Sequence, residues 1–256
     1  AEGNVAIGDN ALYANTTGYI NTAVGNNALS SNVVGLGCTA VGDNALADNL
    51  NSYNTAVGRS ALANNTSADS NTAVGSIALF TNTTGANLVG IGESALYANT
   101  TGSANTAVGR FSLTANTTGG ANTALGYQAG KATTTGGSCV FVGHNAGLSN
   151  TTGVRNVCMG QAAGLSLTTG DDNIFIGEGA GYPGTTGNGN TVVGSLAART
   201  LTTGHSNTTM GQNALYGITE GTENTTMGAS AGSSITTGTN NVCIGTRAGL
   251  ANQPGG

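Results

Sequence analysis

The side chains best suited to chemistry in this chain are two histidines, scattered acids and four cysteines. A catalytic site needs several such groups gathered outside any repeating pattern. His144 and His205 lie about three and a half repeats apart, on the order of 17 Å for stacked strands, so they cannot share a proton relay or a metal. The adjacent acids Asp171 and Asp172 fall in a turn, and nothing positions them for glycoside cleavage. We therefore expect no enzymatic activity, no metal and no cofactor.

The four cysteines could form disulfides, but their spacing argues against bonds within one chain. Cys38 and Cys139 are six repeats apart, or roughly 29 Å. Cys139 and Cys158 come closest, at about 8 Å, beyond the usual Cα limit of about 7 Å. We expect all four, Cys243 included, to be small apolar ladder residues. A cross-link about a symmetry axis is the alternative.

The element that must position every side chain is a short repeat centred on Asn-Thr-Ala-Val-Gly. Its closing glycine, taken as position 0, recurs every 17 residues with a single interval of 16 between Gly42 and Gly58. The repeat glycines are Gly8, Gly25, Gly42, Gly58, Gly75, Gly92, Gly109, Gly126, Gly143, Gly160, Gly177, Gly194, Gly211, Gly228 and Gly245. A fixed period of this kind indicates a repeat architecture.

The residues before each glycine predict a strand from position −4 to position 0. Position −1 is always aliphatic or Met, and position −3 is Thr or β-branched. These residue types favour strands, and the −1 column is interpreted as a ladder facing inward. Position −2 points the other way yet is also apolar, which is typical of a strand covered on both faces. We therefore expect a self-association face at Ala6, Ala23, Ala40, Ala56, Ala73, Phe141, Cys158, Phe175, Val192 and Cys243.

The rest of the repeat predicts turns and a stacked polar column. Position −4 is Asn in twelve repeats, which favours side-chain amides linked from coil to coil. Position +3 is almost always Ala, and position +4 is Leu in the first seven repeats and mostly Gly afterwards. We expect one array over 1–256, with a Leu-type corner at about 4–120, a Gly-type corner at about 121–250 and a non-repeat tail at 251–256.

Composition excludes several classes of protein. Only 7% of residues are charged, the net charge is −5, and Lys and Arg number 6, too few to follow a phosphate backbone. No run of eighteen apolar residues is present, so we expect no membrane insertion. Disorder, the usual reading of Gly- and Asn-rich sequences, does not explain apolar residues at fixed positions. The fold class expected is therefore all-β, a parallel β-solenoid of about fifteen 17-residue coils.

The motifs resemble those of known fibre proteins. Asn-Thr-Ala-Val-Gly followed by Ala-Leu and Asn-Thr-Thr-Gly, as in 15–18, is similar to the repeats of phage and virus tail-fibre proteins. The strand core at 4–8 also resembles the head repeats of trimeric autotransporter adhesins. That resemblance implies left-handed parallel β-rolls packed as a homotrimer. It covers essentially the whole chain, but fibres with one shaft serve many functions.

Three functions remain open at this point. The first is a structural fibre or spike shaft for attachment or adhesion at a cell or virion surface, which is an extracellular location. The second is a self-polymerising extracellular filament built from coils that continue from one subunit to the next. The third is a Thr-ladder solenoid that binds ice or a glycan. The partner expected is the chain itself, as a homotrimer or an end-to-end filament, with a surface glycan or receptor as a further candidate.

Overall fold

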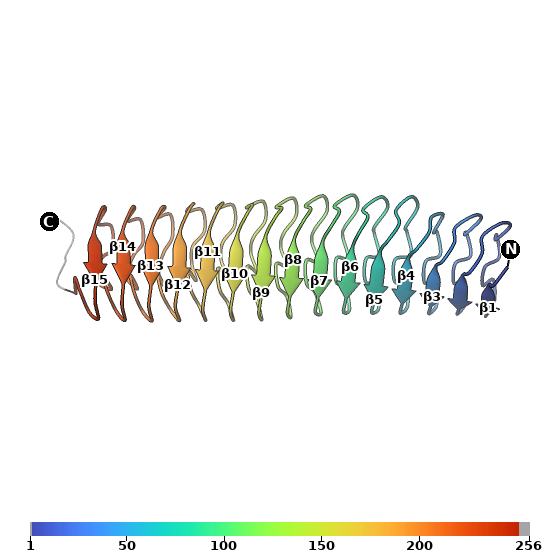
Figure 1. Cartoon of the computed structure of the whole chain (residues 1–256), viewed down its shortest axis with the longest axis horizontal. Helices are drawn as coiled ribbons and strands as arrows, with labels where there is room; N and C mark the ends of the chain where they lie inside the picture. The colour runs from blue at the N-terminus through green and yellow to red at the C-terminus, as the bar shows by residue number, and fades with distance from the viewer. Residues whose placement is uncertain (1, 251–256) are drawn as a thin grey trace. The chain divides into compact units, whose positions relative to one another are not determined.

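The coils are built around fifteen three-residue strands, all of them parallel. The computed structural model describes residues 2–250, and the expected tail at 251–256 lies outside them. The described residues contain no helix. The strands are β1 Val5–Ile7, β2 Thr22–Val24, β3 Thr39–Val41, β4 Thr55–Val57, β5 Thr72–Val74, β6 Val89–Ile91, β7 Thr106–Val108, β8 Thr123–Leu125, β9 Val140–Val142, β10 Val157–Met159, β11 Ile174–Ile176, β12 Thr191–Val193, β13 Thr208–Met210, β14 Thr225–Met227 and β15 Val242–Ile244 (Figure 1). The predicted all-β parallel solenoid with a 17-residue repeat is confirmed.

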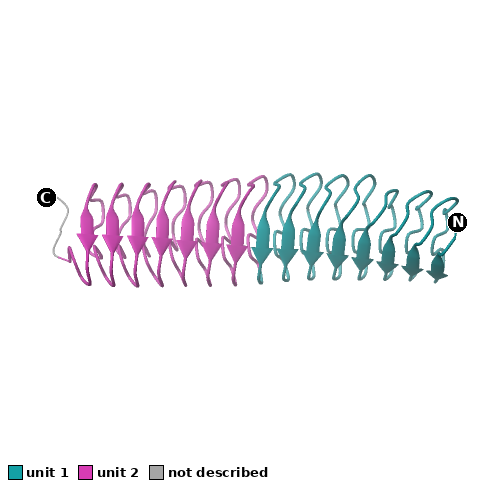
Figure 2. Cartoon of the chain, viewed as in Figure 1, with its two compact units in different colours: residues 1–127 teal, residues 128–256 magenta. Residues whose placement is uncertain are grey.

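The chain divides into two compact units. Unit 1 is Ala1–Tyr127 and contains β1 to β8, whereas unit 2 is Gln128–Gly256 and contains β9 to β15 (Figure 2). Within each unit every strand pairs with the next one along the chain, so that equivalent repeat positions lie side by side. In unit 1, for example, Ala23 pairs with Ala40, and in unit 2 Cys158 pairs with Phe175.

The coil with 16 residues keeps the same pairing as its neighbours. Thr39 of β3 still pairs with Thr55 of β4. The missing residue is taken from the turn, where Asn51 stands in for the usual glycine. The Asn51 carbonyl oxygen accepts a hydrogen bond from Asn49 Nδ2 at 2.6 Å, as the Gly102 carbonyl does from Asn99 Nδ2 at 2.9 Å. The turn therefore absorbs the deletion and the strand register is unchanged.

The corners of each coil depend on residues in the left-handed region. Positions −5, +2 and +4 repeatedly have φ near +55°, as at Ile20 (56°), Asn27 (52°) and Leu29 (51°). A residue with a Cβ pays about 1 kcal/mol or more for this conformation. Hydrogen bonds to the neighbouring coil offset the cost, since Asn27 N donates to Asp9 O at 2.8 Å and Leu29 N donates to Ala45 O at 3.0 Å. Hydrophobicity does not reveal these corners, because packing selects them.

The repeat glycines have a more extreme backbone than the other corner residues. All fifteen have φ between 119° and 142°, a region that residues with a side chain rarely adopt. A Cβ on Gly92 would lie 2.6 Å from the carbonyl carbon of Gly109 in the next coil. Glycine at position 0 is therefore required twice, for its conformation and for the close approach of neighbouring coils.

The interior of the coil is at position −2, opposite to the prediction. Among the residues expected to form a self-association face, Ala23, Ala40, Ala56, Ala73, Phe141, Cys158, Phe175, Val192 and Cys243 are buried in the core, and Ala6 is exposed in the first coil. The predicted inward ladder at position −1 is likewise wrong, because residues such as Ile91 are exposed. Period-2 alternation assigned the two faces of the strand correctly. It could not decide which face points inward, because both are apolar.

The core is thin, and its large side chains lie at position +4 in unit 1 but partly at position −2 in unit 2. In unit 1, Leu at position +4 is buried against a strand that carries Ala or Gly at position −2, as with Leu79, whose Cγ lies 3.1 Å from the position of a Cβ on Gly90 in the next coil. In unit 2, Phe141 and Phe175 fill position −2, and the corner beside them is Gly147 or Gly181. A Cβ on Gly181 would lie 2.7 Å from Phe175 Cδ1. At Gly147 and Gly181 the phenylalanine on the strand therefore leaves no room for the Leu that unit 1 carries at this corner.

Buried asparagines form ladders that run from coil to coil. In unit 2, Asn190 Nδ2 donates to Asn173 Oδ1 at 3.1 Å and to Gly204 O at 2.9 Å. The expected amide-to-amide link at position −4 is confirmed there. In unit 1 the direct amide link lies at position +7 instead, where Asn99 Nδ2 donates to Asn82 Oδ1 at 2.8 Å. These bonds satisfy amides that would otherwise be buried at a cost of about 1–3 kcal/mol each.

Cys139 replaces one asparagine of the position −4 ladder and imitates its bonding. Its Sγ accepts from Asn156 N at 3.5 Å and donates to Gly153 O at 3.4 Å. Burial raises the pKa of the Cys139 thiol, so the donating S–H is retained at neutral pH. An amide makes stronger hydrogen bonds than a thiol in the same place.

We expect Cys139→Asn to raise the free energy of unfolding by about 0.5–1 kcal/mol, and Cys139→Ala to lower it by about 1 kcal/mol or more. Urea denaturation of the two variants and the parent chain measures both changes. If Asn and Ala had the same effect, the bonds to Gly153 and Asn156 would not be what position −4 requires.

Candidate self-association face

The side chains at positions −3 and −1 point away from the core and form what we call the outer face. Val57 is 37% exposed and Ile91 is 38% exposed in unit 1, and Met210 reaches 49% in unit 2. Position −3 is Val5, Thr22, Thr39, Thr55, Thr72, Val89, Thr106, Thr123, Val140, Val157, Ile174, Thr191, Thr208, Thr225 and Val242; position −1 is Ile7, Val24, Val41, Val57, Val74, Ile91, Val108, Leu125, Val142, Met159, Ile176, Val193, Met210, Met227 and Ile244. Hydropathy predicted instead that these residues face the interior of the coil.

The outer face is uncharged and regular, with an aliphatic or Met column at position −1 beside a column of Thr and β-branched aliphatic residues at position −3. None of its side chains is charged, and parallel in-register pairing lines up equivalent residues, as in Val24↔Val41. Eight strands at about 4.8 Å spacing and about 10 Å of strand length give roughly 400 Å² of sheet on unit 1 alone. The largest exposed apolar patch on a typical monomer covers about 300–600 Å² and is often functional, so this face is a candidate interaction surface. In the described part of the chain, no other segment covers this face.

The signal that would have located this face lies in the asparagines. Asn21, at position −4, is fully buried and donates from Nδ2 to Gly35 O at 2.7 Å. Positions −4 and −2 share one side of a strand, so a buried Asn21 places Ala23 inside and leaves Thr22 and Val24 outside. Treating a repeated asparagine as an internal hydrogen-bonding residue, rather than as a surface residue, gives the correct orientation.

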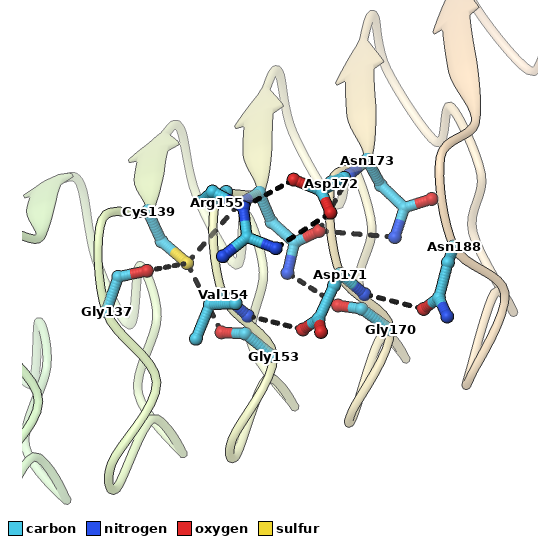
Figure 3. A network of polar contacts seen from close by, with 11 residues as sticks. Gly137, Cys139, Gly153, Val154, Arg155, Gly170, Asp171, Asp172, Asn173 and Asn188 are labelled. Atoms are coloured by element: carbon cyan, nitrogen blue, oxygen red, sulfur yellow. Dashed lines mark hydrogen bonds and ion pairs between the residues drawn. The ribbon is translucent and has the colours of Figure 1, made fainter.

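Charged groups cluster at one corner of unit 2. Arg155 Nε donates to Asp172 Oδ1 at 2.6 Å and Nη2 donates to Asp172 Oδ2 at 2.8 Å, across neighbouring coils (Figure 3). These hydrogen bonds from Arg155 hold the pKa of the Asp172 carboxyl below its usual range. Asp171 lies beside them and accepts a hydrogen bond at Oδ1 from Val154 N at 2.8 Å. The ion pair links adjacent turns. Because it is exposed to solvent, it contributes little to stability.

His205, Ser206 and Asp172 line one hollow, but they do not form a catalytic triad. The His205 Nδ1 and Ser206 Oγ atoms are 3.5 Å apart, longer than the roughly 2.6–3.2 Å expected for an activated nucleophile. Asp172 is engaged by Arg155 and does not orient the imidazole. His144 lies exposed at position +1 in another coil, so the structure does not bring the two histidines together.

The remaining sequence candidates also stay separate. All four cysteines are buried thiols that form no disulfide, and burial raises the pKa of Cys158 strongly. Over residues 2–250, no group of three or more His, Cys, Asp or Glu side chains is placed to hold a metal ion. A search of the same residues finds no helix with the length and hydropathy needed to cross a bilayer.

Comparison with known proteins does not add a relative. No family model matches the chain, and neither does any curated protein or any solved structure. The tail-fibre and adhesin resemblance therefore depends only on the repeat motif itself.

Proposed function

We propose that this chain is a structural shaft that associates with copies of itself through the outer face, as a parallel homotrimer. The observation that carries the proposal is the uncharged, exposed Thr and aliphatic surface at positions −3 and −1. Burying such a surface is favourable at about 25 cal/mol per Å². In a parallel trimer each flat sheet packs against those of two partners. We also propose that the chain coils in the left-handed sense, as the adhesin heads do.

A passive structural role fits the way in which the coils are held together. Each coil contacts its neighbours through strand pairing, buried amide ladders and turn hydrogen bonds, so stiffness is distributed along the array. The polar turns remain on the surface, where a shaft meets solvent. We propose an extracellular location at a cell or virion surface, where such a shaft would position an attachment tip or adhere directly.

Charge on the outer face is expected to break up the assembly. Val57→Lys combined with Ile91→Lys places two ammonium groups in the proposed interface, where their desolvation is costly. We expect the parent chain to sediment at three times its 24.8 kDa mass, and the double variant to sediment as a single chain with unchanged far-UV circular dichroism. Analytical ultracentrifugation measures the mass.

The matched control adds the same charge to the turns of the same two coils. Ser67 and Thr101 are exposed, and Ser67→Lys combined with Thr101→Lys should leave the trimer intact. A parent chain that is a compact monomer, or a control that dissociates as readily as the face variant, would contradict the proposal. Filaments of indefinite length in electron micrographs would favour end-to-end polymerisation instead.

A further inference from the structure

A hollow in unit 2 lies above Gly189, away from the outer face. Gly189 is at position −5, which carries a side chain in most coils. In the two adjacent coils this position is Asp172 and Ser206. A Cβ on Gly189 would have only Ser206 Oγ within 4 Å, at 3.8 Å. The resulting hollow has a volume of about 400 Å³. By contrast, the ring of Tyr53 fills the space at Gly37, with Cδ1 at 3.1 Å from the position of a Cβ.

The walls of the hollow offer hydrogen-bonding groups that the fold does not use. Thr186 and Thr203 line it from position +9. The preceding threonine of each turn is engaged, since Thr185 Oγ1 donates to Thr202 O at 3.3 Å, but no described residue bonds to the hydroxyls of Thr186 and Thr203. Asn188 accepts at Oδ1 from Asp171 N at 2.8 Å, which fixes its amide and leaves Nδ2 to donate outward. These groups are held in place by adjacent coils rather than by flexible loops.

The chemistry of this lining selects a neutral ligand. No Lys or Arg lines the hollow, and Arg155 beside it is paired with Asp172, so the lining offers no arginine or lysine charge for a phosphate or carboxylate. Among the described residues no group of three or more His, Cys, Asp or Glu side chains is placed to hold a metal ion, and the hollow has a single carboxylate, Asp172, which is paired with Arg155. Besides the Asp172 carboxylate, the hollow is lined by hydroxyl, amide and imidazole groups together with Thr methyl groups and glycine backbone. A sugar ring matches this mixture, because it presents hydroxyls at its edge and C–H groups on its faces.

We propose that the hollow above Gly189 is a subsite for one neutral sugar residue of a glycan. The Asn188 amide and the Thr186 and Thr203 hydroxyls bond the sugar hydroxyls, and the imidazole of His205 closes one wall. None of these residues belongs to the outer face, so the proposal does not depend on self-association. A shallow site for one ring is expected to bind weakly, with a Kd on the order of 1 mM.

The test is saturation-transfer NMR with D-glucose, D-galactose and N-acetyl-D-glucosamine as probes. At least one of them should give a saturable signal with the parent chain. Gly189→Asn fills the hollow at a position where other coils already carry Asn, as at Asn87, and should weaken binding at least about tenfold. Thr203→Val removes one hydroxyl without changing shape and should weaken binding about twofold to tenfold.

The matched control is Ala104→Asn in unit 1. Ala104 occupies position −5 with φ of 58°, so the substitution adds the same side chain in the same conformation, far along the chain from the hollow. Sugar binding should be unchanged in this variant. The proposal is overturned if none of the three sugars binds, if Gly189→Asn and Thr203→Val bind as the parent does, or if Ala104→Asn loses binding equally.

Discussion

Replacing Gly109 by alanine is expected to lower the free energy of unfolding by about 3–5 kcal/mol, among the largest effects of any single methyl group in this chain. The backbone at Gly109 has φ of 133°, which strains any residue with a Cβ by about 1–3 kcal/mol. The new methyl would also lie 2.6 Å from the Gly126 carbonyl carbon. The next coil must therefore move, and hydrogen bonds such as Gly126 N to Val108 O, at 2.8 Å, are disturbed. Urea denaturation followed by circular dichroism measures the loss.

The two terminal coils separate the strain from the clash. Gly8 and Gly245 have similar backbones, with φ of 128° and 119°. A Cβ on Gly8 would lie 2.5 Å from Gly25 O, whereas a Cβ on Gly245 has nothing within 4 Å. Gly8→Ala should therefore lower the hydrogen-exchange protection of the amides in its coil more than Gly245→Ala lowers it in the last coil. Equal losses of protection would mean that close approach between coils is not the reason for glycine at position 0.

Phe141→Ala is expected to destabilise unit 2 by about 3–5 kcal/mol, and Gly147→Leu in the same chain should restore most of the loss. Phe141 is fully buried, so truncation leaves a cavity. Gly147→Leu alone should also destabilise, because its Cβ would overlap the Phe141 ring. Together the two changes recreate the Ala and Leu pairing of unit 1, where leucines at position +4 adopt φ of 46° to 54°. The double variant should then lie within about 1.5 kcal/mol of the parent.

A double-mutant cycle in urea measures this coupling. The control combines Phe141→Ala with Gly232→Leu, which is the same corner position five coils further along. A Cβ on Gly232 would clash with Thr226 Cγ2 at 2.8 Å, so the substitution destabilises by itself. Sites this far apart should be additive within about 0.5 kcal/mol. Additivity at Gly147 as well would show that corner and strand do not share one core volume.

The period and the strands could be predicted from the sequence because they depend on residues that recur in one column. Gly42 and Val41 mark the end of a strand in the same way as Gly25 and Val24 do. The orientation could not be predicted from hydropathy, since Ala40 inside and Val41 outside are both apolar. It depends on hydrogen bonding at position −4, which composition does not show.

The corners were harder to predict for a different reason. Ile20 and Leu29 adopt positive φ although neither residue prefers it, because contacts with neighbouring coils select the conformation. The change from Leu to Gly at position +4 was visible as two versions of one corner. The cause of this change could not be predicted, because the sequence pattern places Phe141 on a self-association face and not in the core. The self-association face was misplaced because the strand was oriented the wrong way round. The expectation that this chain has no enzymatic activity stays a prediction.

The shortened coil between Gly42 and Gly58 has a consequence for how such chains vary. Because the turn at Asn51 loses a residue while β3 and β4 keep their register, the strand and the turn respond differently to insertion and deletion. Changes of length are tolerated at the turn, and a shift within the strand would exchange inner and outer side chains. Differences in length between coils of this kind are therefore expected in the turns, with the strand register unchanged.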